Sequence, residues 1–207
     1  MKLFSNSFEN GSRIPDKFCF CVPDFEGTIK MGLNINPHLA WSDAPETTKS
    51  FALICYDPDV PASGELVNDV NKVVPVEFPR FDFFHWVVSD IPANLNEIAE
   101  GIDSNGITPR GKKTGLNAIG NAGINDYTNW FANDESMSGF YGAYDGPCPP
   151  FNDERLHHYI FKVFALDVES VSLEGNYAGA DLLKAIDGHV IDSAEITVTY
   201  TLNKKML

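Results

Sequence analysis

Strand-like patterns in five segments most constrain what this chain can fold into. Residues 194–202 alternate between apolar and polar side chains, which is typical of a strand with one buried face. Residues 50–56, 83–88 and 157–166 are instead continuous apolar and aromatic runs, as expected for strands covered on both faces. Residues 27–35 form a weaker fifth segment. We therefore predict a mainly β fold in which the apolar runs lie at the centre of a sheet.

One helix and one long loop complete this prediction. Residues 179–187 have helical signals, because Asp181 stands in the first turn and Gly188 follows the end. Residues 100–150 show little periodicity and are rich in Gly, Asn and Asp, and loops of that length are usually functional or mobile. A chain of 207 residues is the size of one domain, so residues 1–207 are predicted to form a single domain.

The charge of the chain excludes several classes of partner. Fifteen Lys and Arg residues against 29 Asp and Glu residues give a formal net charge of -14 at pH 7. This charge opposes binding to nucleic-acid backbones and to anionic membrane surfaces. No apolar stretch is long enough to span a membrane, and the first residues lack the apolar core of a secretion signal. We expect a cytoplasmic protein without nucleic-acid binding or stable membrane insertion.

The cysteine spacing predicts thiols rather than disulfides. The four cysteines, Cys19, Cys21, Cys55 and Cys148, form no CxxC pair, and in a cytoplasmic chain buried reduced thiols are expected. Cys148 stands among prolines, which supply no N–H groups to stabilise a thiolate. A packed thiol is therefore favoured over a catalytic nucleophile at Cys148.

Two acidic residues mark the first candidate site. Standard enzyme signatures such as HExxH, GxSxG and the phosphate-binding Gly-rich loops are absent. Asp57 and Asp59 directly follow the apolar run of residues 50–56, where Pro58 and Pro61 stop the strand and stiffen the turn. Because Asp and Pro are also ordinary turn residues, a solvated turn is the alternative interpretation.

Histidine and tyrosine side chains on two other strands complete the set. His85 lies inside an apolar strand, where a structural hydrogen bond would explain it as well as a functional role. Strand alternation places His157 and Tyr159 on one face and His158 on the other. Just upstream, residues 146–150 (GPCPP) form a stiff rim whose few free N–H groups are suited to face an anion. Together these residues predict a small pocket lined by imidazoles, a phenol and carboxylates.

In combination, these motifs resemble the phosphatidylethanolamine-binding proteins, the family that includes Raf kinase inhibitor protein, and most closely its prokaryotic branch. The motifs that carry the resemblance are DPDVP at residues 57–61, HWVV at 85–88, GPCPP at 146–150 and LHHY at 156–159. The likeness extends over nearly the whole chain. It implies a Greek-key β-sandwich in which a large central sheet packs against a smaller one, with one or two short helices.

The resemblance also implies a function. Family members have a small pocket for phosphate-like anions or phospholipid head groups, so we expect a non-enzymatic binding protein without a metal or other cofactor. A kinase or protease is a possible protein partner, and a homodimer is a possible assembly. The motifs assign the pocket to Asp57, Asp59, His85, Gly146, Pro147, His157 and Tyr159.

Two departures from the family pattern leave alternatives open. Residues 128–140 resemble an insertion, and their Trp130, Phe131 and Phe140 would cover the pocket or form a partner surface. The helix that follows the last strand in eukaryotic members is not expected here, which makes kinase regulation the least transferable property. The alternatives are a protein-interaction or protease-inhibitor module that acts through residues 128–140, and a hydrolase that depends on His and Asp.

The residue types suggest how an anion would be held. An ionised Asp57 only accepts hydrogen bonds and would repel a dianion, so we expect it to orient an imidazole or the anion to keep a proton. Donors would come from His85, His157, Tyr159 and backbone N–H groups. If the imidazoles titrate at their ordinary pKa, affinity should rise as the pH falls through about 6.5.

Overall fold

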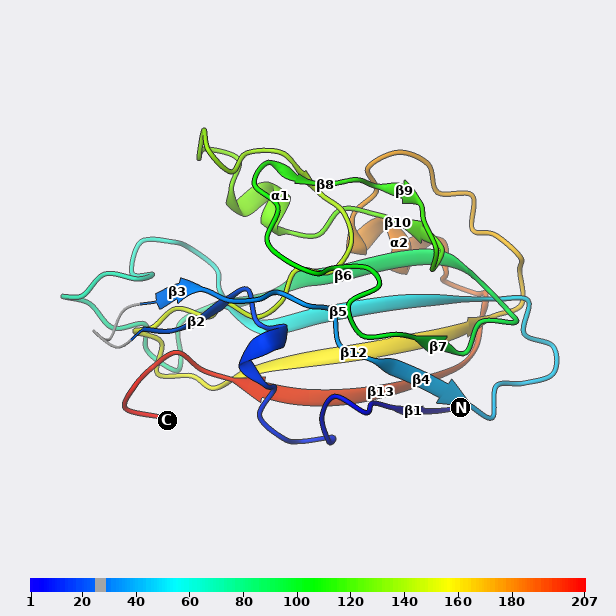
Figure 1. The fold of residues 1–207 in the computed structure, drawn as a ribbon, viewed down its shortest axis with the longest axis horizontal. Helices are drawn as coiled ribbons and strands as arrows, with labels where there is room; N and C mark the ends of the chain where they lie inside the picture. Colours follow the sequence, from blue (N-terminus) through cyan, green and yellow to red (C-terminus); the bar gives the residue numbers. More distant parts are fainter. Residues whose placement is uncertain (25–28) are drawn as a thin grey trace.

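An antiparallel sheet of six strands, in the order β13-β12-β5-β6-β10-β9, forms the centre of the molecule in the computed structural model, which describes residues 1–24 and 29–207 (Figure 1). Its strands are β5 (Ser50–Pro61), β6 (Arg80–Pro92), β9 (Gly115–Leu116), β10 (Asn121–Ala122), β12 (His157–Leu166) and β13 (Val190–Tyr200). β5, β6 and β12 contain the predicted segments 50–56, 83–88 and 157–166, and β13 covers residues 194–200 of the predicted segment 194–202. Each continuous apolar run lies in β5, β6 or β12, inside the sheet.

Smaller sheets flank this one. A three-stranded sheet has the order β1-β4-β7, and two pairs of short strands, β2 with β3 and β8 with β11, lie in the loop regions. The bounds are β1 (Lys2–Phe4), β2 (Cys21–Pro23), β3 (Ile29–Met31), β4 (Leu39–Ser42), β7 (Glu97–Ile98), β8 (Gly111–Lys112) and β11 (Phe140–Tyr141). The predicted combination of a large and a smaller sheet is confirmed. Of the weak segment 27–35, residues 29–31 form β3, and residues 27 and 28 lie outside the described part.

Short helices account for little of the described chain. The 3-10 helix η1 (Asp16–Phe18) and the helix α1 (Tyr127–Trp130) are single turns, whereas α2 (Gly179–Ala185) is the helix predicted at residues 179–187. The Asp181 carboxylate accepts a hydrogen bond from the Ala178 N–H at 2.9 Å, which caps the start of α2. A Cβ atom at Gly179 would lie 2.3 Å from the Phe84 ring, so the close packing of α2 on β6 requires glycine there.

The core lies on both faces of the central sheet. Along β5, Leu53 and Cys55 point into a large apolar cluster, and Ala52 and Ile54 point into a second cluster that includes Leu182 of α2. All four β5 side chains are buried, which is why this run shows no alternation between apolar and polar residues. Within the described residues, no helix is long and apolar enough to cross a bilayer.

The strand ends that carry the predicted motifs meet at one end of the sheet. Asp57 near the end of β5 pairs with Phe83 near the start of β6, and Tyr56 pairs with Ile160 near the start of β12. Antiparallel pairing therefore brings together motifs that lie up to a hundred residues apart in the chain.

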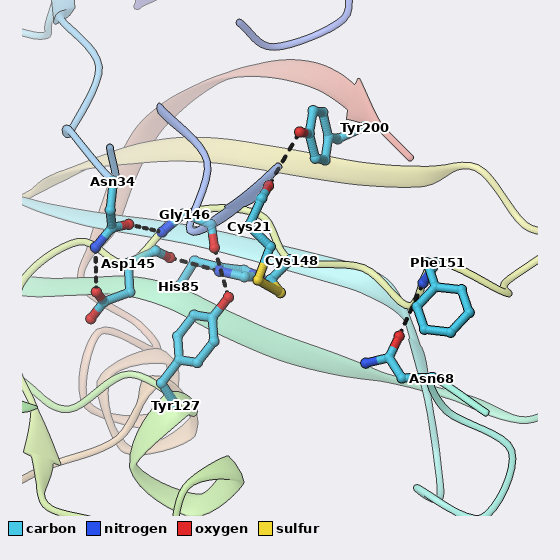
Figure 2. Close-up of a disulfide and its surroundings, with 10 residues drawn as sticks. All are labelled: Cys21, Asn34, Asn68, His85, Tyr127, Asp145, Gly146, Cys148, Phe151 and Tyr200. Carbon is cyan, nitrogen blue, oxygen red and sulfur yellow. Dashed lines mark hydrogen bonds between the residues drawn. A yellow bond between two sulfur atoms is a disulfide. The ribbon is translucent and has the colours of Figure 1, made fainter. Parts of the chain in front are cut away.

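The cysteine prediction is wrong for two of the four residues. Cys21 of β2 and Cys148 of the rim form a disulfide that joins positions 127 residues apart, whereas Cys19 and Cys55 are free and buried (Figure 2). No local spacing indicates this bond, because the fold alone brings the two sulfur atoms together. Disulfides persist in oxidising compartments and are rare in the reducing cytosol, so this bond argues against the predicted cytoplasmic location.

Candidate functional site

A cavity of about 190 Å³ opens at this end of the central sheet. Four of the seven predicted site residues line it: Asp57, His85, His157 and Tyr159. The rest of the wall is mainly apolar and aromatic. It consists of Phe20, Cys21, Ile29, Met31, Val60, Pro61, Val67, Asn68, Phe83, Tyr127, Trp130, Phe131, Cys148, Pro149 and Pro150.

His157 lies buried between two carboxylates. Its Nδ1 donates to Asp57 Oδ2 at 2.7 Å, and its Nε2 donates to Asp153 Oδ2 at 3.1 Å. Burial by itself lowers the pKa of His157, but the two carboxylates outweigh burial and raise the pKa to about 9. His157 is therefore an imidazolium at neutral pH, and both of its N–H groups are used inside the protein. This geometry contradicts the prediction that His157 donates to the ligand, and it shows the contact through which Asp57 orients an imidazole.

Arg80 balances the second carboxylate. Both of its terminal nitrogens donate to the Asp153 carboxylate, and the same guanidinium also donates to the backbone oxygens of Asp59 and Pro75 at 2.7 Å each. Two carboxylates, Asp57 and Asp153, thus face two cations, His157 and Arg80. We call these four side chains the floor of the cavity, and their formal charges cancel.

His85 has the opposite character. Its Nδ1 lies 2.7 Å from the Asp145 carbonyl oxygen, which only accepts, so Nδ1 carries the proton. Its Nε2 is buried and has no hydrogen-bond partner. Burial lowers the pKa of His85 to about 4, although the nearby Asp57 carboxylate acts in the opposite direction. His85 is therefore neutral at pH 7 and presents a lone pair on Nε2.

A buried polar network fixes the backbone that holds His85. The Asp145 carboxylate accepts a hydrogen bond from Asn34 at 2.7 Å (Figure 2). It also accepts from Lys112 and from Asn125, each at 2.8 Å. Burial raises the pKa of Asp145, and the Lys112 ammonium opposes that rise. Because the carboxylate is held on three sides, the Asp145 carbonyl stays in place as the acceptor for His85.

Two rim residues do not line the cavity. Gly146 donates its N–H to Asn34 Oδ1 at 2.8 Å, and its carbonyl accepts from the Tyr127 hydroxyl at 2.8 Å (Figure 2). The Pro147 carbonyl accepts from the N–H groups of Phe20 and Cys21. The predicted role of the Gly146 N–H as an anion donor is therefore wrong, since that group is already used. Glycine is required at 146 by close packing, because a Cβ would lie 2.0 Å from the Phe18 carbonyl oxygen.

Asp59 also lies outside the cavity wall. Its carboxylate accepts from His158 Nδ1 at 2.8 Å and from Arg155 at 3.3 Å. His158 lies outside the wall as well, as strand alternation predicts, with 46% of its side chain exposed. The pair Asp57 and Asp59 is thus divided, because β5 is irregular between Asp57 and Val60 and the two carboxylates serve different histidines.

Tyr159 supplies the hydroxyl of the cavity. Burial raises the pKa of Tyr159 well above its ordinary value, and the adjacent Asp57 carboxylate raises it further. The phenol therefore stays protonated and keeps its O–H as a hydrogen-bond donor beside the Asp57 carboxylate. Its ring lies 5.2 Å from the His85 ring, so the two side chains share one part of the cavity.

Residues 128–140 divide between two roles. Trp130 and Phe131 line the cavity, and Phe131 stacks on Tyr127 with ring centroids 5.6 Å apart. Phe140 instead lies in β11, does not line the cavity and is 58% exposed. Trp130 and Phe131 thus form part of the cavity wall, which agrees with the interpretation that this segment lies at the pocket.

Sequence reasoning missed several residues of this site. Asp153 stands four positions before His157, a spacing that would have identified it, but no pattern links either residue to Arg80. Tyr127 gave no signal because it lies in the long irregular segment. Among the described residues, no group of three or more His, Cys, Asp or Glu side chains has the geometry to hold a metal ion.

The fold is that of a known class of protein. The family model for phosphatidylethanolamine-binding protein matches residues 4–201. The chain belongs to this family.

Bacterial relatives support the assignment. The chain is 34% identical to a UPF0098 protein of Aquifex aeolicus over 97% of this chain and 88% of the relative, and 31% identical to the UPF0098 protein YbhB of Escherichia coli over 97% of this chain and all of the relative. Among solved structures it is similar to Escherichia coli YbcL, described as a new member of the mammalian PEBP family, with a TM-score of 0.68, 30% identity and 97% of each chain covered. A phosphatidylethanolamine-binding protein homologue from Chlamydia trachomatis gives a TM-score of 0.64 at 29% identity, with 96% of this chain and 95% of that chain covered.

Proposed function

We propose that this chain is a non-enzymatic binding protein whose cavity takes a small phosphate-like anion or a phosphorylated head group. One observation carries the proposal: His85 Nε2 is a buried polar atom without a partner in the wall of the cavity. A buried polar atom left unpaired costs about 1–3 kcal/mol, and a polar ligand atom removes that cost. The Tyr159 hydroxyl lines the same cavity and supplies a donor.

The charges of the floor favour a ligand of low charge. The formal charges of Asp57 and Asp153 are balanced by those of His157 and Arg80, all of which are held in ion pairs. The described wall contains no Lys or Arg. A dianion would therefore find no free cation to neutralise it, which supports a singly charged head group.

The shifted pKa values change the pH dependence expected from the sequence. With His157 at about 9 and His85 at about 4, neither imidazole titrates near 6.5. The expectation that affinity rises through that pH because the imidazoles become charged is wrong. The two imidazoles therefore give no reason to expect the affinity to change between pH 5 and 8.

The chemistry of the wall supports binding rather than catalysis. The described lining residues include no Ser, Thr or Lys, and both of their cysteines are joined in the disulfide. Of the two histidines that a His/Asp-dependent hydrolase would use, His85 and His157, the second is already protonated and held by two carboxylates, so it is not available as a base.

A titration with phosphoethanolamine, followed by calorimetry at pH 6, tests the proposal. We expect saturable binding with one site, and the Tyr159→Phe variant should bind about 5-fold to 10-fold more weakly because it lacks the hydroxyl donor. The matched control is Asp59→Asn, whose side chain lies outside the wall and should leave the affinity unchanged. Absence of saturable binding in the folded wild-type protein would refute the proposal.

The remaining predictions about partners and location stay predictions. Trp130 is 49% exposed and Phe140 is 58% exposed, so both side chains are accessible to a kinase, a protease or a second copy of the chain. The cytoplasmic location conflicts with the disulfide, and measuring the redox state of Cys21 and Cys148 in cells would decide between them.

A further inference from the structure

The disulfide between Cys21 and Cys148 lies in the wall of the cavity, although binding of a head group makes no use of it (Figure 2). Cys21 is 5% exposed and Cys148 is half-buried, so Cys148 is the more accessible of the two. Both residues line the cavity. A small molecule that enters the cavity can therefore reach the bond.

The other two cysteines do not compete with this bond for a thiol reagent. Cys19 and Cys55 are free and buried, and neither lines the cavity. Burial raises the pKa of both thiols, so neither forms the thiolate that attacks a disulfide. Disulfide chemistry is therefore confined to Cys21, Cys148 and an incoming thiol.

The bond also links two parts of the cavity wall. Within the described chain, β2 and β3 form a two-stranded sheet of their own, and β3 contributes Ile29 and Met31 to the wall. Cys21 is the first residue of β2 and pairs with Met31. The disulfide thus joins this small sheet covalently to the rim at Cys148.

We propose that the Cys21–Cys148 disulfide is a redox-active site that a small dithiol reaches through the cavity, so that the redox state of the bond and the occupancy of the cavity control each other. The effect of occupancy rests on the proposed function, whereas the redox-active site does not depend on it.

The reaction is a thiol–disulfide exchange. A thiolate of the dithiol attacks the Cys148 sulfur, and the electron pair of the broken S–S bond goes to the Cys21 sulfur, which takes up the proton that the reagent gave to water. The second thiol of the reagent then attacks the mixed disulfide, closes the reagent's own disulfide and releases Cys148 as a thiol. The dithiol loses two electrons, and the protein gains two thiols.

Occupancy and redox state are coupled in two ways. The cavity of about 190 Å³ is small enough that a bound head group excludes a dithiol, so the ligand shields the sulfur atoms. Reduction in turn removes the covalent link between β2 and the rim, so Ile29 and Met31 are held less firmly in the wall and the ligand binds more weakly. Because coupling between two equilibria is reciprocal, the ligand also favours the oxidised bond.

The rate of reduction tests the access route. Samples are quenched with iodoacetamide, and mass spectrometry then follows the peptides that contain Cys21 and Cys148. Each rate is divided by the rate for an exposed peptide disulfide. Dithiothreitol should then reduce the bond at least about 10-fold faster than the protein dithiol thioredoxin, because a folded protein cannot enter the cavity.

Two variants assign the route to the cavity. Trp130 lines the cavity and is 49% exposed, so its side chain lies at the entrance. Trp130→Ala should raise the rate with dithiothreitol about 3-fold or more, since reduction depends on access to the sulfur atoms. Phe140→Ala removes an exposed aromatic side chain outside the wall and should leave the rate unchanged.

Phosphoethanolamine tests the coupling. At ten times its calorimetric dissociation constant it should slow reduction by dithiothreitol about 10-fold, since only about one cavity in eleven is then empty. Wild-type protein kept reduced in excess dithiothreitol should bind phosphoethanolamine about 5-fold more weakly than oxidised protein. The double variant Cys21→Ser, Cys148→Ser should show the same weak binding with and without dithiothreitol, which assigns the effect to this bond.

The outcomes separate the inference from the proposed function. Equal normalised rates for both reductants with no change in Trp130→Ala, or a bond that dithiothreitol does not reduce in the folded protein, would overturn the inference. Phosphoethanolamine that binds without slowing reduction would overturn the coupling and leave the proposed function intact. Absence of phosphoethanolamine binding would refute the proposed function, and the rates with the two reductants would still decide whether the cavity leads to a redox-active disulfide.

Discussion

A buried imidazolium and a buried neutral imidazole stand a short distance apart in this site, on neighbouring parts of one cavity wall. His157 is charged because Asp57 and Asp153 hold both of its nitrogens, and His85 is neutral because burial and the Asp145 carbonyl leave Nε2 unprotonated. The same side chain thus has two roles that are set by its partners. His157 organises the carboxylates, and His85 presents an acceptor to the cavity.

These two histidines predict a maximum of stability near pH 6.5. The pKa of His157 is raised, so its contribution to the free energy of unfolding is full below about 6.5 and is lost as the pH rises through about 9. The pKa of His85 is lowered, so its contribution is full above about 6.5 and is lost as the pH falls through about 4. Each displacement corresponds to about 3 kcal/mol. Urea unfolding between pH 4 and 9.5 measures both limbs.

A substitution of His157 separates the loss of stability at alkaline pH from the loss at acidic pH. His157→Gln should remove most of the loss of stability between pH 6.5 and 9 and should destabilise the protein at pH 6.5 by about 3–5 kcal/mol, because the buried Asp57 carboxylate loses its cation while Asp153 keeps Arg80. His189→Gln is the matched control, since His189 is exposed beside Asp167. An alkaline limb that is unchanged in His157→Gln would show that another group causes it.

At the scale of elements, the disulfide ties β2 to the rim of the cavity. Cys21 and Cys148 close a loop between positions 127 residues apart, and a crosslink of that span stabilises a folded chain by about 2–5 kcal/mol through the unfolded state. Replacing both residues by Ala should lower the free energy of unfolding by that amount. The rim itself should stay in place, because the Pro147 carbonyl still accepts from the N–H groups of Phe20 and Cys21.

Reduction provides an independent measurement of the same effect. Wild-type protein unfolded in urea with a thiol reductant should match the double Ala variant, and the reductant should not change the unfolding of that variant. Cys19 and Cys55 do not complicate the comparison, since both are buried and burial raises the pKa of each thiol. A wild-type unfolding midpoint that does not respond to reductant would contradict the assigned bond.

Strands and helices could be predicted from the sequence where their pattern is local. The site could be predicted only in part, because several of its contacts join distant parts of the chain. The run at 157–166 forms β12 with the same bounds because its apolar residues and its flanking turn are contiguous. The separation of Asp57 from Asp59 depends on an irregularity in the pairing of β5 with β6, which no local pattern records. The Arg80 to Asp153 pair and the disulfide depend on sheet order, since their members lie 73 and 127 residues apart.

At the scale of the whole molecule, the net charge and the cavity act on a ligand in opposite directions. The formal charge of -14 opposes the approach of an anion, whereas the floor of the cavity is internally balanced and binds through hydrogen bonds. Long-range repulsion is screened by salt, but short hydrogen bonds inside a cavity are not. The two contributions can therefore be separated by ionic strength.

We predict that affinity for a monoanion increases with salt. As the ionic strength rises from 0.01 to 0.15 M, the Debye length falls from about 30 Å to about 8 Å, and the repulsion by distant carboxylates is largely screened. Methyl phosphate at pH 5 should therefore bind several-fold more tightly at the higher salt, as calorimetric titration in KCl would show. Phosphoethanolamine is the control, because its ammonium cancels the charge of its monoanionic phosphate and its affinity should stay nearly constant. A fall in the affinity for methyl phosphate would instead show that free cations near the cavity dominate binding, in conflict with the ion pairs that hold His157 and Arg80.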